Sequence, residues 1–359
     1  MIDLVIVSSF DWSVPGTPEL FSETASIGEI NTIHFTKPNN IFTLKKETHN
    51  DLNFVKTVRL KFISARLSKY KAFNKIQCKL IISQISRCIN NNKKYKTKPK
   101  LIYTNLEAIS GILPMIKKYF SEIYYICADY SDLGASFHEN ALYADKILTI
   151  PQSMIDIIEE EYPGKTILWP QMTSYYEKGI KERESVKELL KKIPKPRVVY
   201  SGVAANRLDM RLYNNLCLNL PEVSFVTFTD DINITRNQNR YEIPWLCKSK
   251  LMSFISDCDV GIMPYDVKQL HNLHCVPLKL FEFLEAGLPV VSTKLLNLTS
   301  FHPHVYLAND EQDFIRVLKS KINNGTNDEE KKEIKSLAKS HRTVNNIAKL
   351  RELLNLNIK

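Results

Sequence analysis

No stretch of the sequence is apolar for long enough to cross a membrane. Apolar runs such as 4–7 and 198–200 have the length of strands, whereas a membrane-spanning helix needs about 20 apolar residues. The opening residues MIDLVIVSSFDW have neither the basic start nor the small-residue cleavage site of a signal peptide. We therefore expect a cytoplasmic protein, with these residues forming the first strand of the fold.

The cysteine pattern excludes the usual zinc sites. The seven cysteines are scattered, none forms a C-x-x-C pair, and none groups with histidines at the spacing of zinc ligands. Such a set suits a reducing compartment. The D-x-D at Asp257–Asp259 lies where a strand is expected to begin. We therefore predict that the protein uses no metal and no cofactor.

Acidic residues are nearly missing from residues 45–100. This basic segment holds 16 Lys or Arg and 2 Asp or Glu, a net charge of +14 in a chain whose total is +10. So local an excess points to an anionic partner. No recognised nucleic-acid motif is present, so we expect no nucleic acid to bind. Apolar residues recur at largely helical intervals within 55–76, which predicts a basic amphipathic helix. It could lie on an anionic membrane surface or pack against the core.

Strands and helices are predicted to alternate in two series joined near 171–196. This pattern is typical of α/β domains with mostly parallel sheets. We predict one domain at 1–175, a second at 176–335, and a C-terminal helix at 336–359. Ligands of such sheets bind at the carboxyl ends of the strands, so the site is expected in a cleft between the two domains.

The segment at 261–293, GIMPYDVKQLHNLHCVPLKLFEFLEAGLPVVST, has the organisation of a ligand-binding unit. A strand ends in Pro264 and Tyr265, and after a polar loop a short helix begins near Pro277. Lys279 and Glu282 lie one helical turn apart on one face. The helix N-terminus and Lys279 suit phosphate, and Glu282 could accept hydrogen bonds from ribose hydroxyls. The alternative is a surface helix on which both side chains are merely solvated.

This segment resembles the nucleotide-sugar-binding motif of GT-B glycosyltransferases, P-x-K-x-x-E-x-x-x-x-G-x-P-V-V. The matching residues are Pro277, Lys279, Glu282, Gly287, Pro289, Val290 and Val291. The resemblance implies two Rossmann-like domains facing across a cleft, with the donor held by the second and the C-terminal helix crossing back to the first. On that wall we also expect Gly202, Tyr265 and Arg207, although Arg207 could instead pair with Asp209. Phe228 or Thr229 could border the nucleobase, and His271 or His274 could reach the sugar or be inert.

A weaker likeness covers most of the chain. Ser8–Asp11, Gly261–Tyr265 and Ala128–Asp129 resemble stretches of the glucuronosyltransferase of xanthan-type gum synthesis, an inverting, metal-independent GT-B enzyme. The resemblance implies that Asp129 is the catalytic base, although an Asp at this place could simply cap the next helix. Asp132 is the alternative base, and Asp132 and Asp11 are the expected acceptor residues. His274 stands where many retaining members carry the first Glu of a Glu-x7-Glu pair.

These observations predict a glycosyltransferase of bacterial surface polysaccharide synthesis. Its donor is expected to be a UDP-sugar, and its acceptor a glycan or a polyprenyl-linked glycan at the inner membrane face, which the basic segment would contact. Three alternatives remain open. One is a nucleotide-sugar 2-epimerase of the same fold, and another is a non-catalytic module that binds a nucleotide or an anionic polymer. The third is a nucleic-acid-binding protein that uses the basic segment.

Overall fold

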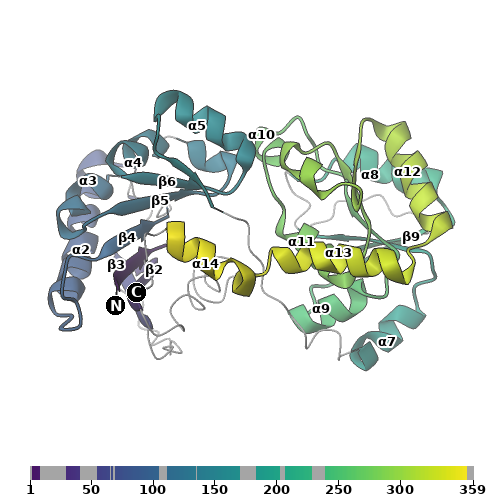
Figure 1. Cartoon of the computed structure of the whole chain (residues 1–359), viewed down its shortest axis with the longest axis horizontal. Coiled ribbons are helices and arrows are strands. Elements are labelled where there is room, and N and C mark those ends of the chain that lie inside the picture. The colour runs from purple at the N-terminus through teal and green to yellow at the C-terminus, as the bar shows by residue number, and fades with distance from the viewer. Residues whose placement is uncertain are drawn as a thin grey trace. The chain divides into compact units, whose positions relative to one another are not determined.

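The chain folds into two α/β units, each with its own parallel sheet and buried core (Figure 1). The computed structural model describes residues 2–8, 30–40, 55–64, 66–67, 69–104, 111–134, 136–169, 183–202, 207–228 and 239–353. The first unit comprises Met1–Met172 with Asn346–Lys359, and the second comprises Thr173–Asn345. The predicted pair of α/β halves is therefore confirmed.

The first unit is built on a seven-stranded parallel sheet with the order β3-β2-β1-β4-β5-β6-β7. Its strands are β1 (Ile2–Val7), β2 (Ile30–Asn40), β3 (Val55–Phe62), β4 (Lys100–Tyr103), β5 (Ile123–Cys127), β6 (Lys146–Thr149) and β7 (Thr166–Leu168). Its helices include α2 (Lys71–Asn90), α3 (Leu113–Ile116), α4 (Phe137–Tyr143) and α5 (Ile155–Glu161). Val5 and Val7 pack into one core and Leu4 and Ile6 into another. Both faces of β1 are thus buried, which explains its unbroken apolar sequence.

The second unit has a six-stranded parallel sheet with the order β10-β9-β8-β11-β12-β13. Its strands are β8 (Arg197–Ser201), β9 (Ser224–Phe228), β10 (Arg240–Ile243), β11 (Val260–Met263), β12 (Val290–Thr293) and β13 (Val305–Ala308). Its helices are α7 (Arg183–Lys191), α8 (Met210–Asn219), α9 (Lys248–Ile255), α10 (Leu270–Leu273), α11 (Leu278–Ala286), α12 (Glu311–Asn324) and α13 (Asp328–Ser340). The strand order reverses between β8 and β11. At such a reversal the carboxyl ends of the strands leave an opening for a ligand.

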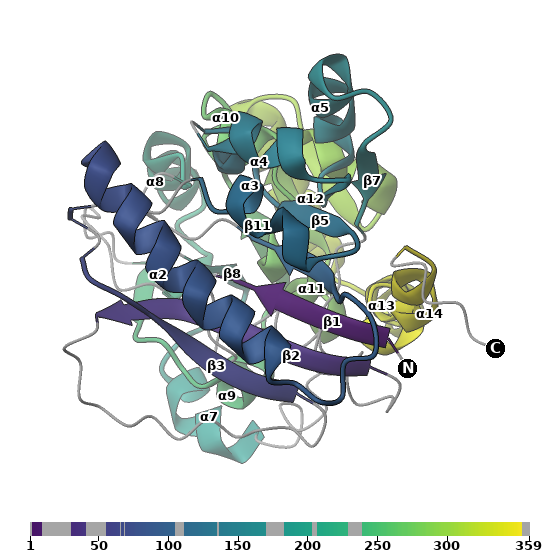
Figure 2. The ribbon, with the colours of Figure 1, turned by 90° about the vertical axis from the view of Figure 1, so that its left-hand side faces the viewer.

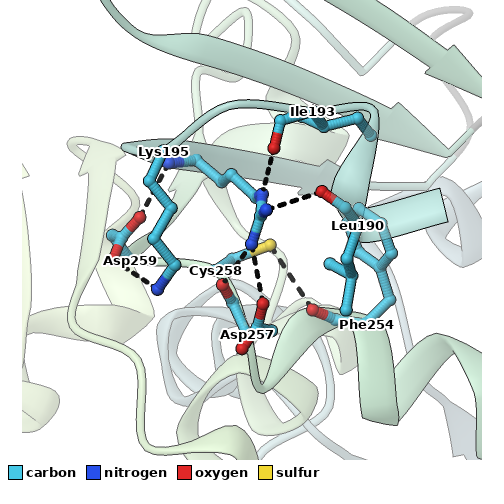
Figure 3. A network of polar contacts seen from close by, with 8 residues as sticks. Leu190, Ile193, Lys195, Phe254, Asp257, Cys258 and Asp259 are labelled. Atoms are coloured by element: carbon cyan, nitrogen blue, oxygen red, sulfur yellow. Dashed lines mark hydrogen bonds and ion pairs between the residues drawn. The ribbon is translucent and has the colours of Figure 1, made fainter. Parts of the chain in front are cut away.

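A polar network surrounds Arg197 at the amino end of β8. Figure 3 labels residues that contribute to it, among them Leu190, Asp257 and Asp259. The Arg197 guanidinium donates to the carbonyl oxygens of Leu190 and Ile193, at 2.7 and 2.8 Å, and to the Asp257 carboxylate at 2.7 Å. Asp259 accepts from the Arg197 amide at 2.7 Å and lies 3.4 Å from Lys195 Nζ. The carboxylates of the D-x-D therefore bind Arg197 and Lys195 at the amino end of β11.

The predicted helix at 55–76 is wrong. Residues 55–62 form strand β3, and the helix begins only at Lys71. The apolar residues Val58, Leu60 and Phe62 alternate with Arg59 and Lys61 and pack against the core. This period of two belongs to a strand. Figure 2 shows α2 lying against the sheet that contains β1, β2 and β3.

The C-terminal helix predicted at 336–359 is interrupted. It divides into α13 and α14 (Thr343–Leu353) at His341 and Arg342. The His341 ring lies 5.0 Å from that of Phe281 and 5.3 Å from that of Phe301. Arg342 forms a bidentate ion pair with Glu285, with both contacts at 2.6 Å. These contacts anchor the junction to α11, after which Asn346–Lys359 belongs to the first unit.

None of the helices in the described ranges is both long enough and apolar enough to cross a membrane.

Candidate functional site

The residues predicted to bind the donor gather at the reversal point of the second sheet. Gly202 directly follows β8, Tyr265 lies two residues after β11, and Lys279 is the second residue of α11. Since parallel strands point the same way, β8 and β11 bring their carboxyl ends to one edge of the sheet. A helix that follows such a strand begins at that same edge, so the α11 N-terminus also lies there.

Lys279 is enclosed by two tyrosine rings and a glycine. Its Nζ lies 4.0 Å from the centroid of Tyr200 and 5.2 Å from that of Tyr265, within the range of cation–π contacts. A Cβ placed on Gly202 would lie only 2.0 Å from Nζ, and Gly202 has a φ of +142°. Gly202 therefore leaves the space that the ammonium group occupies. We call Lys279, Tyr200, Tyr265 and Gly202 the lysine box.

Enclosure changes the chemistry of this lysine. Burial lowers the pKa of Lys279 to about 7, and the neighbouring charge of Glu282 opposes that effect only in part. Near neutral pH the amine is thus balanced between its charged and neutral forms. An anion bound beside it would favour the charged form and raise its pKa. The box is therefore suited to recognise phosphate.

Sequence reasoning brought three of the four box residues together but missed Tyr200. Tyr200 is fully buried inside an apolar strand, so it reads as an ordinary core residue. Its position two residues before Gly202 on β8 was the available signal, because strand-end residues next to a glycine turn approach the ligand edge.

Arg207 connects the segment before α8 to helix α10. Its Nη1 donates to the carbonyl oxygen of His271 at 2.9 Å and to Asn272 Oδ1 at 3.2 Å. The buried Asn272 side chain donates in return to the carbonyls of Arg207 and Asp266, at 3.1 and 2.9 Å. Asp209, the pairing partner suggested by the sequence, caps α8 by accepting from the Leu212 amide at 3.0 Å. Arg207 is still close enough for its charge to lower the pKa of Lys279.

Glu282 has a partner that the sequence did not suggest. Its Oε1 forms an ion pair with Nζ of Lys248, the first residue of α9. The two side chains are 16% and 27% exposed, so the pair is largely withdrawn from water. The expected contact with ribose therefore has to be made by a carboxylate that already holds a lysine.

Phe228 and His274 were also expected on this wall, and the structure describes both. Phe228 is fully buried and packs edge-on against Phe254, with ring centroids 5.1 Å apart, so its ring belongs to the core. Thr229 lies outside the described residues. Burial lowers the pKa of His274, which favours its neutral form.

In the first unit, Asp129 and Asp132 lie together after β5, at the carboxyl end predicted for them. Asp129 is the N-cap of a short 3₁₀ helix, η2 (Tyr130–Leu133). Asp132 Oδ2 accepts from the amides of Ala128 and Asp129, at 2.8 and 2.9 Å. Burial raises the pKa of Asp132, and the charge of Asp129 adds to the rise. Asp132 thus closes the turn that presents Asp129. Asp11 lies outside the described residues.

Within the described ranges, no three His, Cys, Asp or Glu side chains are grouped so that they could hold a metal ion. Metal independence stays a prediction.

Comparisons with known proteins support the fold. No protein-family model matches the chain. The "Putative teichuronic acid biosynthesis glycosyltransferase TuaH" of Bacillus subtilis (strain 168) is 29% identical over 116 residues, which are 30% of this chain and 29% of that protein. The match thus spans less than a third of the relative's length.

The similarity to solved structures extends over almost the whole chain. A sucrose-phosphate synthase of Thermosynechococcus elongatus matches with a TM-score of 0.72 at 10% identity, over 99% of both chains. The Anabaena protein Alr3699/HepE, solved in complex with UDP, matches with a TM-score of 0.67 at 10% identity, over 99% of this chain and 100% of that one. An E. coli structure bound to UDP-2-fluoro glucose matches with a TM-score of 0.67 at 9% identity, over 99% of both chains. At these identities the likeness establishes the fold.

Proposed function

We propose that this chain, which has the GT-B fold, is a glycosyltransferase that takes a sugar from a UDP-linked donor and passes it to a glycan or lipid-linked acceptor. The observation that carries the proposal is the lysine box at the α11 N-terminus. A cation held between two rings at the ligand edge of a parallel sheet suits a diphosphate. The solved neighbours that contain UDP or a UDP-sugar and the likeness to TuaH add support.

The proposed reaction is a direct displacement. The acceptor hydroxyl oxygen attacks the anomeric carbon, the bond from that carbon to the diphosphate oxygen breaks, and the configuration inverts. Lys279 and the α11 N-terminus stabilise the negative charge that develops on the diphosphate, so no metal is needed for that task. Asp129 accepts the acceptor proton. Its place just past the end of β5 suits this role, and Asp132 holds the turn.

We further propose that the first unit contacts an anionic membrane that supplies a lipid-linked acceptor for surface polysaccharide. No acidic residue occurs from 52 to 106. The outer face of α2 carries exposed Lys71, Lys75 and Lys79. Beside them Leu67, Tyr70 and Ile76 are 36%, 56% and 54% exposed. Exposed apolar groups among lysines suit a lipid interface better than a soluble polyanion.

Nucleotide binding tests the donor part of the proposal. We expect calorimetry to show UDP binding, with GDP at least about tenfold weaker because a site shaped for one base leaves polar groups unpaired with another. Turnover is then followed as UDP release from a panel of UDP-sugars with polyprenyl-linked acceptors. If neither nucleotide binds, the proposal fails. Binding without turnover across the panel would favour a non-catalytic module.

Vesicle sedimentation tests the membrane part. We expect the protein to bind vesicles containing phosphatidylglycerol and not vesicles of phosphatidylcholine alone. Changing Lys71, Lys75 and Lys79 to Gln should weaken binding by about 100-fold, at roughly 1 kcal/mol for each lysine. The exposed Lys319, Lys332 and Lys339 of the second unit, changed to Gln, provide a control with the same loss of charge. Equal losses in both triple variants would contradict a specific surface on α2.

A further inference from the structure

Two helices that begin at the ligand edge of the second sheet, α9 and α11, carry a lysine in their first turn. Lys248 is the first residue of α9 and Lys279 the second residue of α11, and neither helix has an acidic residue in its first turn. The N-terminus of a helix carries partial positive charge, so a cation there is locally unfavourable. A residue that violates a local preference needs a compensating interaction, and such positions are often functional.

Glu282 provides the compensating interaction for Lys248. It pairs with Lys248 across α9 and α11, and its charge also reaches Lys279, whose pKa it raises. The carboxylate thus lies between two cations. Lys248 holds Oε1, and a carboxylate has a second oxygen that can accept hydrogen bonds from a diol.

We propose that Lys248 is a positioning residue of the donor site. It fixes the orientation of Glu282 so that the second carboxylate oxygen faces the ribose hydroxyls. The inference rests on the proposed function, because it assigns Lys248 a part in binding the nucleotide of the donor. Lys248 acts through Glu282 and does not contact the phosphates, which are bound by Lys279.

This division of labour separates the nucleoside from the phosphates. Pyrophosphate has no ribose, so its binding depends on Lys279 and is indifferent to the orientation of Glu282. UDP carries both parts. A change at Lys248 should therefore reduce the affinity for UDP and leave the affinity for pyrophosphate nearly constant.

The test is calorimetric titration of the full chain with UDP and with pyrophosphate. We expect Lys248→Met to weaken UDP binding about tenfold, while pyrophosphate binding stays within about twofold of the wild type. Lys248→Arg should restore most of the UDP affinity, since it retains the charge. The control is Lys250→Met, an exposed lysine of the same helix, which should bind both ligands normally. Melting temperatures show that the variants are folded.

A double-mutant cycle decides whether Lys248 acts through Glu282. Glu282→Gln should weaken UDP binding by a similar factor, and adding Lys248→Met should weaken it no further. Additive losses, unchanged UDP binding in Lys248→Met, or a parallel loss of pyrophosphate would each overturn the inference; the last would make Lys248 a phosphate ligand. A wild type that binds pyrophosphate but neither UDP nor GDP would refute the proposed function itself, and the inference with it.

Discussion

Replacing Lys279 with methionine should abolish nucleotide binding and at the same time stabilise the fold. Methionine keeps the length of the side chain between Tyr200 and Tyr265 but removes the charge. Loss of a partly buried cation from a diphosphate should weaken UDP binding by about 100-fold or more. Calorimetry measures this loss, and Lys294→Met, an exposed lysine nearby in sequence, is the control that should bind UDP normally.

The gain in stability follows from the lowered pKa. Lys279 titrates near 7 in the folded protein and at 10.5 as a free side chain. The unfolded chain therefore binds more protons between these values, and the stability of the wild type rises with pH across that window. At or below pH 7 the enclosed amine costs on the order of 2–4 kcal/mol. Lys279→Met should melt several degrees higher at pH 7, and this advantage should shrink towards pH 10.

The same pKa sets the pH dependence of binding. Because phosphate selects the protonated amine, UDP affinity in the wild type should fall as the pH rises above about 7. Binding below that pH should take up little additional proton, and binding above it should take up close to one. A melting temperature unchanged by Lys279→Met, together with pH-independent UDP binding, would show that Lys279 is an ordinary solvated lysine.

Replacing Gly202 with alanine should disable the box without touching the lysine itself. The new Cβ would lie 2.0 Å from Nζ and 2.6 Å from Cε of Lys279. The flexible end of Lys279 would have to leave the two rings and return towards solvent. We expect UDP binding to weaken by about 10- to 100-fold, and the pKa of Lys279, followed by NMR, to rise back towards its ordinary value.

Gly325→Ala is the matched control for this variant. Gly325 also has a positive φ, of +64°, but no atom lies within 4 Å of its hypothetical Cβ. Alanine at either position strains the backbone, so both variants should lose some stability. Only Gly202→Ala should lose nucleotide binding. If both bind UDP equally well, then Gly202 does not hold Lys279 in place.

The sequence by itself determined the α11 part of the proposed donor site, because that part is local. Pro277, Lys279, Gly287 and Pro289 lie within one short helix and its ends, where helix geometry fixes their relations. Gly287 ends α11 in the left-handed conformation, with φ of +79°, as the motif requires. Asp129 after β5 was foreseen for the same reason, since a strand end is visible in the chain.

Errors arose where two periodicities competed. The run at 55–76 contains apolar residues at helical spacing, but Val58, Leu60 and Phe62 also alternate. Pairing with β2 decided for the strand, and a partner strand cannot be seen from within one segment. The break between α13 and α14 also depends on contacts that are distant in sequence. Its causes, Phe281, Phe301 and Glu285, lie about 40 to 60 residues earlier in the chain.

What only the tertiary structure decided is the environment of the charges. Motif spacing placed Lys279 and Glu282 on one helix face but could not show that Tyr200 and Gly202 enclose the first, or that Lys248 holds the second. These partners come from β8 and α9, dozens of residues away. The pKa of an ionisable side chain, and its freedom to bind a ligand, depend on burial and on neighbours within a few ångströms. Those neighbours are set by strand order and helix packing, which no local pattern records.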